Sequence, residues 1–276
     1  MKQKRLTDLQ KIELIELFKR GKSSKELSDY FGITDVAIRV LLKNRGFKYN
    51  MSKSCQRFDI NETYFDIIDT QDKAYFLGFL YADGCNKRPR NVVTLILKEE
   101  DKEILEQLNK LIFPNKPLIF EKDYRNNHSD KYGIRISNKH ISLKLEELGV
   151  VKAKTHKIIF PNWLNEDLYS HFIRGYFDGD GYIGTVVNDK GHFKDKVSIV
   201  GTESFVNSLN NIFKEVLSIN SSIEIRHPER NNNIRTLTIS GRLQVVKLMD
   251  YLYNNSNLKL KRKYDKYKQI KTRYKR

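Results

Sequence analysis

A nine-residue pattern occurs twice in this chain and limits its fold more than any other feature. The two copies are FLGFLYADG at residues 76–84 and IRGYFDGDG at residues 173–181. Each copy ends an apolar run of helical length with an acid and a glycine, and the acids, Asp83 and Asp180, lie 97 residues apart. Such self-similarity indicates a duplicated unit with one carboxylate in each half of a pseudo-symmetric molecule.

Small residues inside the pattern fall on one face of each expected helix. Gly78 and Ala82 are four residues apart, as are Gly175 and Gly179, and such positions share a helix face. Glycine inside a helix costs up to about 1 kcal/mol relative to alanine, so a packing reason is expected. We predict that the two helices pack closely against each other, which brings the two acids together at their ends.

The acids themselves are unusual at the end of a helix. A carboxylate there opposes the helix dipole by about 0.3–1 kcal/mol, and two neighbouring carboxylates also repel each other. A bound divalent cation would offset both penalties. A single Asp-Gly pair is better explained as an ordinary turn, but its recurrence behind the same small-residue spacing favours a metal site at Asp83 and Asp180.

The segments that follow each pattern repeat one order of elements. After the first copy, the pattern predicts strands at 91–98, 118–122 and 132–137 and helices at 101–112 and 140–148. After the second copy, it predicts strands at 182–187, 197–200, 223–226 and 235–240 and helices at 203–217 and 242–253. We therefore predict an α+β fold of two pseudo-symmetric αββαββα repeats.

The N-terminal region, residues 7–47, is typical of three short helices. Thr7 and Ser23 each begin a capping-box pattern, and Thr34 is placed to cap a third helix. The first helix carries an apolar stripe formed by Leu9, Ile12, Ile15, Leu17 and Phe18. A helix, a glycine-containing turn and a basic helix resemble a helix-turn-helix module. We expect three basic residues of the third helix to face DNA, with a plain packing domain as the alternative; they are Arg39, Lys43 and Arg45.

Composition narrows the partner class. The formal net charge of +17 favours a polyanion such as nucleic acid over the alternative of a merely soluble basic protein. The 39% hydrophobic residues suffice for a core, and Cys55 and Cys85 support neither a disulfide framework nor a zinc site. Because no segment is typical of a signal peptide or a membrane span, we expect an intracellular, soluble protein.

Both nine-residue segments resemble the signature of LAGLIDADG homing endonucleases, and their duplication resembles the single-chain, two-motif form of that family. The resemblance covers about residues 70–268. It implies motif helices at the interface of the repeats and two saddle-shaped antiparallel sheets that lie in the DNA major groove. The eighth motif position holds the family's metal-binding acid, here Asp83 and Asp180. The sixth position is Asp178 in the second copy but Tyr81 in the first, which departs from the family pattern.

The resemblance also implies catalytic lysines, because this family has a lysine near the end of each repeat, close to the scissile phosphates. In the first repeat Lys154 corresponds best, with Lys157 as the alternative. In the second repeat, alternation through residues 259–263 favours Lys261. The implied chemistry is phosphodiester hydrolysis assisted by Mg²⁺ (or Mn²⁺), with Asp83 and Asp180 as metal ligands.

The alternation of side chains along the strands predicts which faces meet DNA. Isoleucines on either side of Arg135 are expected to point into the core, which leaves Arg135 outward, and the same alternation leaves Lys196 outward. Arginine can read guanine bidentately, while lysine mostly meets phosphate. Outside the N-terminal region, the expected DNA contacts are Arg88, Arg90, Arg135, Lys194, Lys196, Arg226 and Lys263.

The function that the resemblance implies is that of a monomeric, site-specific double-strand DNA endonuclease. Two alternatives remain open: a DNA-binding regulator of the same fold that has lost catalysis, and a maturase that binds intron RNA. The expected location is the cytoplasm, associated with the nucleoid, or an organelle. The expected organisation is a helix-turn-helix-like module at 1–50, a linker at 51–70, repeats at 71–164 and 165–256, and a basic tail at 257–276.

Overall fold

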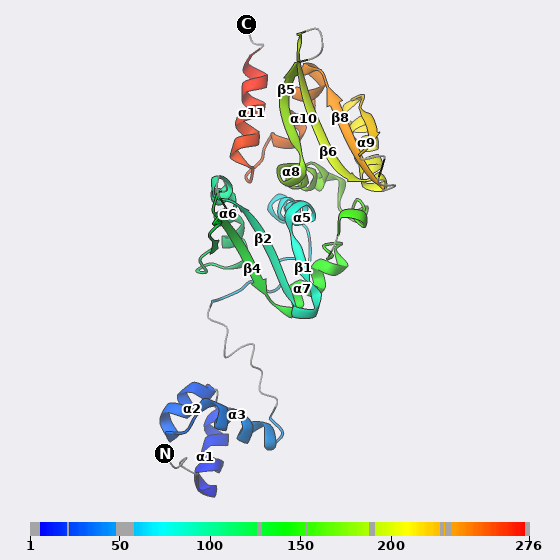
Figure 1. Ribbon diagram of the computed structural model, residues 1–276. Coiled ribbons are helices and arrows are strands. Elements are labelled where there is room, and N and C mark those ends of the chain that lie inside the picture. The colour runs from blue at the N-terminus through cyan, green and yellow to red at the C-terminus, as the bar shows by residue number, and fades with distance from the viewer. Residues whose placement is uncertain are drawn as a thin grey trace. The chain divides into compact units, whose positions relative to one another are not determined.

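A computed structural model describes residues 6–273 apart from residues 21, 48–57, 126–128, 153, 188–190, 227–228 and 230–232 (Figure 1). The chain divides into two compact units, Met1–Asp59 and Ile60–Arg276. The boundary that the sequence predicts after residue 50 lies outside the described residues.

The first unit consists of three helices, α1 (Asp8–Lys19), α2 (Ser24–Phe31) and α3 (Asp35–Asn44). Both predicted capping boxes are present, and the Thr34 side chain accepts a hydrogen bond at the start of α3. Gly32 ends α2 in the left-handed region, with φ of 64°, where glycine avoids the steric cost of a side chain. The predicted three-helix unit is therefore confirmed as a structure.

The apolar stripe predicted for α1 is partly wrong. Leu9 and Ile12 are 80% and 53% exposed, whereas Leu14 is fully buried and packs with residues of α2 and α3. At about 100° per residue, Leu9 and Ile12 lie on the side of the helix opposite Leu14. Apolar residues on both sides of α1 made the sequence pattern ambiguous, and contact with α2 and α3 selects the side of Leu14.

The second unit contains two repeats with the same order of elements. The first repeat comprises α5 (Gln71–Asp83), β1 (Cys85–Lys87), β2 (Val92–Lys98), α6 (Lys102–Ile112), β3 (Ile119–Glu121), β4 (Lys131–Ser137) and α7 (Lys139–Glu147). The second comprises α8 (Tyr169–Asp180), β5 (Tyr182–Val187), β6 (Phe193–Thr202), α9 (Glu203–Leu217), β7 (Ser222–Ile225), β8 (Ile234–Ser240) and α10 (Arg242–Tyr253). Short 3₁₀ helices join them at Arg88–Arg90, Glu99–Asp101, Lys154–His156 and Glu166–Leu168.

Each repeat forms one four-stranded antiparallel sheet, in the orders β1-β2-β4-β3 and β5-β6-β8-β7. The predicted α+β class and αββαββα order are therefore confirmed. Figure 1 shows α5 and α8 side by side, with one sheet on each side of the pair. A single hydrophobic core runs through both repeats. Across the described part of the chain, every helix is too short or too polar to span a membrane.

Glycine allows α5 and α8 to touch through their backbones. A Cβ atom on Gly78 would collide with the Phe172 carbonyl oxygen, and a Cβ atom on Gly175 would collide with the Tyr75 carbonyl oxygen. Phe172 and Tyr75 occupy equivalent positions in the two repeats, so the two contacts are related by the same pseudo-twofold symmetry. The predicted packing of small residues is thus confirmed, and it brings the ends of both helices together.

The C-terminal segment folds as a further helix, α11 (Lys261–Thr272), which packs on α10 and β5. Its buried residues are Lys263, Tyr267 and Ile270. Near its end, the Arg273 guanidinium lies 3.6 Å from the buried Asp195 carboxylate. This basic segment is therefore an integral part of the second unit.

The glycine contacts predict a large loss of stability on a small substitution. Helix propensity alone would favour Gly78→Ala or Gly175→Ala by up to about 1 kcal/mol. Because the added methyl meets backbone atoms, we expect each variant instead to lower the free energy of unfolding by about 3 kcal/mol. Urea denaturation measures this change. Gly191→Ala is the control, because Gly191 lies in open space with φ of 76° and should cost about 1 kcal/mol. Equal losses at Gly78 and Gly191 would contradict the packing account.

Candidate metal and nucleic-acid site

The two motif helices end on the acids that the sequence singles out. α5 ends at Asp83 and α8 ends at Asp180, and each is followed by a glycine in an extended conformation. These glycines are not required for a left-handed turn. A Cβ atom at Gly84 would lie 2.5 Å from the Leu80 carbonyl oxygen, and the equivalent distance at Gly181 is 2.6 Å. Glycine is needed here for space, where the chain leaves the helix for the first strand.

Asp83 and Asp180 are brought together at this end of the helix pair. Both side chains are exposed to solvent. A Cβ atom built on Gly179, the residue before Asp180, would lie 2.8 Å from Asp83 Oδ2. The pKa of Asp83 is raised to about 6, mainly because the protein partly encloses its carboxyl group and secondly because Asp180 is negatively charged. Enclosure also raises the pKa of Asp180.

Lys154, the lysine that the resemblance favours in the first repeat, lies at the end of α5. Its Nζ donates hydrogen bonds to the carbonyl oxygens of Leu80, at 2.8 Å, and Gly84, at 2.5 Å. These carbonyls belong to the helix end, where the dipole is negative. The structure therefore places a cation near the carboxylate of Asp83, and its charge partly opposes the rise in the pKa of that carboxyl.

The equivalent lysine of the second repeat is Lys263. Its Nζ donates to the Phe177 carbonyl oxygen at 2.6 Å and lies 3.3 Å from the Gly179 carbonyl oxygen. Phe177 is the counterpart of Leu80, because each precedes the motif acid of its repeat by three residues. One contact of each lysine therefore corresponds between the repeats, whereas the second contact differs, because the counterpart of Gly84 is Gly181 and not Gly179.

Lys261, the lysine that alternation favours, is exposed at the first position of α11. The alternation assumed an extended chain, but the segment turns helical at Lys261, so side chains two residues apart no longer share a face. Lys263, two residues later, is buried and returns to α8. Lys157, the alternative in the first repeat, is also exposed.

Burial and neighbouring acids act in opposite directions on the pKa values of the two lysines at the helix ends. Burial lowers the pKa of Lys154 to about 8 and that of Lys263 to about 8, while nearby acids act in the opposite direction. Asp83 and Asp180 act on Lys154, whereas Asp178 acts most strongly on Lys263. Two acids and two lysines with perturbed pKa values in one place are typical of a functional site.

The donor set fits a hard divalent cation. Within the described residues, no group of three or more His, Cys, Asp or Glu side chains is arranged to hold a metal ion by itself. A cation at the helix ends would therefore take oxygen ligands from Asp83 and Asp180, with water or phosphate oxygens completing the shell. Mg²⁺ is commonly bound in this way, through one or two carboxylates and retained water. The raised carboxylate pKa values also favour a nearby positive charge.

The outward faces of both sheets carry polar residues, as strand alternation predicts. Arg135 is exposed between Ile134 and Ile136, which are 2% and 1% exposed. Lys196 is half-buried and precedes the buried Val197. Ser198 lies on the same strand and the same face as Lys196, and the residues aligned with Ser198 across the sheet also carry hydroxyl groups, namely Tyr182, Thr238 and Ser222. Hydroxyl and basic side chains on a sheet suit contacts with phosphates and base edges.

The other expected DNA contacts in the repeats differ in their exposure to solvent and in their contacts within the protein. Arg90 and Lys194 are exposed. Arg88 Nε lies 2.6 Å from a carboxylate oxygen of Glu146, so this side chain is already held within the protein. Arg226 is exposed, and its positive charge opposes the rise in the pKa of Asp180 that burial causes.

In the first unit, the three predicted DNA contacts all lie on or just after α3. Lys43 and Arg45 are exposed, while Arg39 forms an ion pair with Asp35 one turn earlier. Between α1 and α3 lies an open groove of about 500 Å³, lined in part by Lys11, Val36, Val40 and Arg45.

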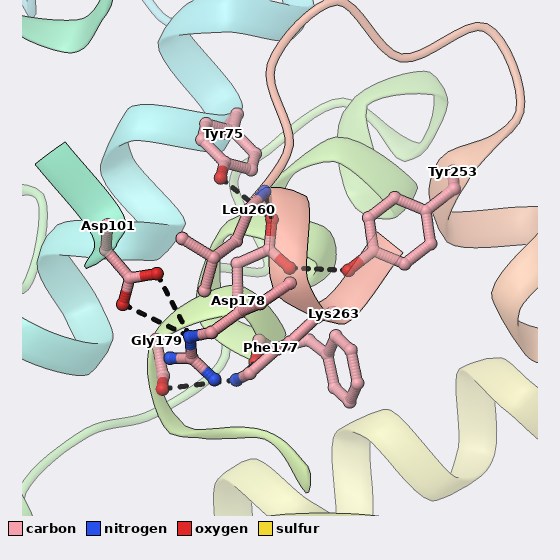
Figure 2. Close-up of polar contacts among 9 residues, drawn as sticks. Tyr75, Asp101, Phe177, Asp178, Gly179, Tyr253, Leu260 and Lys263 are labelled. Atoms are coloured by element: carbon pink, nitrogen blue, oxygen red, sulfur yellow. Dashed lines mark hydrogen bonds and ion pairs between the residues drawn. The ribbon is translucent and has the colours of Figure 1, made fainter. Parts of the chain in front are cut away.

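A buried polar network beside the acids was not predicted. Asp178 is fully buried and accepts hydrogen bonds from the Tyr75 hydroxyl, the Tyr253 hydroxyl and the Leu260 backbone N–H (Figure 2). Arg174, one turn earlier on α8, is also fully buried. Two charged residues inside an otherwise apolar motif helix were the sequence signal for this network, but its partners are distant in sequence.

A family model and two curated proteins match this chain. Residues 167–253, which span the second repeat, match the family described as LAGLIDADG-like domain. An uncharacterized protein of Methanocaldococcus jannaschii is 28% identical over 205 residues, which cover 72% of this chain and 73% of that protein. The glutamine–fructose-6-phosphate aminotransferase of the same organism is 27% identical over 189 residues, 66% of this chain, but the match spans 16% of that enzyme.

Similar solved structures include two LAGLIDADG homing endonucleases in complex with target DNA. I-GzeII is 12% identical, with 72% of this chain and 88% of that chain aligned at a TM-score of 0.48. I-LtrWI is 15% identical, with 77% and 92% of the chains aligned at a TM-score of 0.46. The family match identifies residues 167–253 as a LAGLIDADG-like domain, and residues 76–84 of the first repeat carry a second copy of its nine-residue motif.

Proposed function

We propose that this chain is a site-specific double-strand DNA endonuclease that cuts one phosphodiester in each strand. The observation that carries the proposal is the pairing of two half-sites, Asp83 with Lys154 and Asp180 with Lys263, at the ends of two packed helices. The half-sites are related by pseudo-twofold symmetry, as are the two strands of a DNA duplex. One half-site per strand is the arrangement that suits a double-strand cut.

The residues of each half-site have complementary tasks in this proposal. Asp83 and Asp180 would hold Mg²⁺ (or Mn²⁺), which supplies an activated water and charge stabilisation at the phosphate. Lys154 and Lys263 add fixed positive charge where negative charge develops during hydrolysis. Because main-chain carbonyls hold both ammonium groups, little reorganisation is needed when the phosphate arrives.

Double-stranded DNA is the proposed partner of both units. The net charge of +17 supports electrostatic attraction to the duplex. In the repeats, the outward faces of the two sheets offer Arg135 and Lys196 together with hydroxyl groups. In the first unit, the exposed Lys43 and Arg45 on and after α3 support a second contact that adds affinity or register.

The proposal is tested by incubating the full chain and Mg²⁺ with a randomised duplex library and sequencing the cut ends. Cut ends that belong to one sequence family are expected. Selection of duplexes without cutting would instead identify a DNA-binding regulator, and binding of structured RNA without cutting of duplex DNA would identify a maturase.

Removal of either acid should stop double-strand cleavage. Asp83→Asn and Asp180→Asn each remove a negative oxygen ligand while keeping the size of the side chain. We therefore expect the cleavage rate to fall by about 100-fold or more. DNA affinity should change little, because the sheets supply the contacts. Gel assays of cleavage and binding measure the two effects. Asp167→Asn, an exposed acid in the 3₁₀ helix before α8, is the matched control and should cleave normally.

The pH dependence of stability should report the raised pKa of Asp83. Because its folded pKa of about 6 exceeds the ordinary value of 3.8, the folded state binds the proton more tightly. The contribution of Asp83 to stability is therefore full below about pH 4 and is lost as pH rises through about 6. In metal-free buffer at pH 7.5, Asp83→Asn should be more stable than wild type by about 1 kcal/mol, a value reduced for solvent screening.

Chemical denaturation of both proteins at pH 4, 6 and 7.5 measures that difference. It should vanish at pH 4, and it should shrink at pH 7.5 when Mg²⁺ is added, because only wild type gains a ligand for the cation. A difference that stays constant with pH would show that Asp83 is not perturbed.

The two candidate lysines of the second repeat should behave differently. Lys263→Met keeps the length of the buried side chain but removes the ammonium at the end of α8, so cleavage should slow by about 10²-fold. Lys261→Met changes an exposed residue and should leave single-turnover cleavage within about twofold of wild type. Rapid-quench cleavage assays measure both rates. A larger effect at Lys261 would show that α11 takes a different register on DNA.

A further inference from the structure

The strap, residues 254–260, joins α10 to α11 and leads directly to Lys263. Figure 2 shows the Asp178 carboxylate pointing toward Tyr75, Tyr253 and the backbone of Leu260. The hydrogen bonds are 2.8 Å from the Tyr75 hydroxyl, 2.6 Å from the Tyr253 hydroxyl and 2.8 Å from the Leu260 N–H. Asp178 therefore ties both ends of the strap to α8, because Tyr253 precedes the strap and Leu260 ends it.

Arg174 makes a second set of contacts, one with the strap and one with the end of α10 that precedes it. Its Nε donates to the Leu258 carbonyl oxygen at 2.9 Å, and its Nη1 donates to the Leu252 carbonyl oxygen at 2.9 Å. The guanidinium also lies over the Tyr75 ring, 5.0 Å from its centroid. Arg174 and Asp178 are four residues apart, so one face of α8 holds the strap by an acid and a base. Such fully buried, hydrogen-bonded charges define position sharply, because displacing any partner leaves a charge unsatisfied.

The anchored strap determines where α11 starts and therefore where the Lys263 backbone lies. The Lys263 N–H donates to the Leu260 carbonyl oxygen at 3.1 Å, so Leu260 starts the first turn of α11. The Lys263 ammonium then reaches the carbonyl oxygens of Phe177 and Gly179, the two residues that flank Asp178. One turn of α8 thus holds both elements. The Asp178 side chain binds the strap, and the main-chain carbonyls of Phe177 and Gly179 bind the Lys263 ammonium group.

The first repeat holds its lysine differently. Tyr81 is the counterpart of Asp178, and its hydroxyl donates to the Leu148 carbonyl oxygen, six residues before Lys154. Leu77 is the counterpart of Arg174, so this repeat lacks the buried charged pair at these positions. At these positions a neutral phenol contacts the chain before Lys154 in the first repeat, whereas an acid and a base contact the strap in the second.

We propose that Asp178, assisted by Arg174, is a positioning residue that places Lys263 at its half-site and so controls the cutting of one DNA strand. The other strand depends instead on Tyr81 and Lys154. This inference rests on the proposed endonuclease function and adds that the two half-sites are set by different chemistry.

Strand-resolved cleavage tests the inference. The full-length Asp178→Asn variant is incubated under single-turnover conditions with a target duplex that carries a different label on each strand. The rate ratio of the two cuts should change by about 10–100-fold, in the direction produced by Lys263→Met and opposite to that produced by Lys154→Met. DNA affinity should stay within about threefold of wild type. Tyr81→Phe is the matched control and should shift the ratio the other way. Equal slowing of both strands would overturn the inference.

A second readout does not depend on cleavage. Acylation of lysines followed by mass spectrometry should show that Asp178→Asn increases the reactivity of Lys263 and leaves that of Lys154 unchanged. If wild type cuts no DNA, the proposed function fails, but unchanged protection of Lys263 would separately overturn the positioning role. Should Asp178→Asn fail to fold, Tyr253→Phe provides a milder variant, because it removes one of the three hydrogen-bond donors to Asp178. It should also increase the reactivity of Lys263, but by less.

Discussion

Backbone contact between α5 and α8 is the constraint on which the rest of the second unit depends. The contact exists because Gly78 and Gly175 present no side chain, so each helix rests on a carbonyl of the other. It joins two repeats that each have their own sheet into one hydrophobic core. It also fixes the separation of the two helix ends, and with it the relation between the two acids.

Negative charge is concentrated at the ends of α5 and α8, and two lysine ammonium groups, those of Lys154 and Lys263, lie against it. Carbonyl groups at the C-terminal ends of α5 and α8 already carry partial negative charge, and Asp83 and Asp180 add full charges. Lys154 and Lys263 bind those carbonyls and leave the two carboxylates exposed. The positive charge at the helix ends is therefore held by main-chain carbonyls, while the two carboxylates stay accessible to solvent.

The two repeats share a backbone plan but differ in their buried polar residues. At the sixth motif position, Tyr81 makes one neutral hydrogen bond while Asp178 accepts three. The second repeat also continues into α11, and Arg262 at its start forms an ion pair with Asp101 of the first repeat. The C-terminal segment therefore contacts both repeats, and the symmetry of the motif helices does not extend to the residues that support them.

Much of the fold was predictable because its signals are local. Alternation along the strands predicted the buried and outward residues around Arg135, and capping patterns predicted the starts of α1, α2 and α3. The second repeat was predicted to the residue for β5, α9 and α10. β6 begins four residues earlier than its apolar run suggested, because the charged residues Lys194, Asp195 and Lys196 precede that run. The stripe of α1 was less predictable because apolar residues occupy both sides of that helix.

The sequence by itself determined the duplication, the order of elements and the two acids, because a repeated motif and its periodicity are written in consecutive residues. Tertiary structure alone decided that Lys263 rather than Lys261 reaches the end of α8. It also decided that Asp178 meets Tyr75 and Tyr253, residues far away along the chain. The physical reason is that these contacts depend on the path of the strap and on the crossing of two helices, and neither leaves a periodic trace in the local sequence.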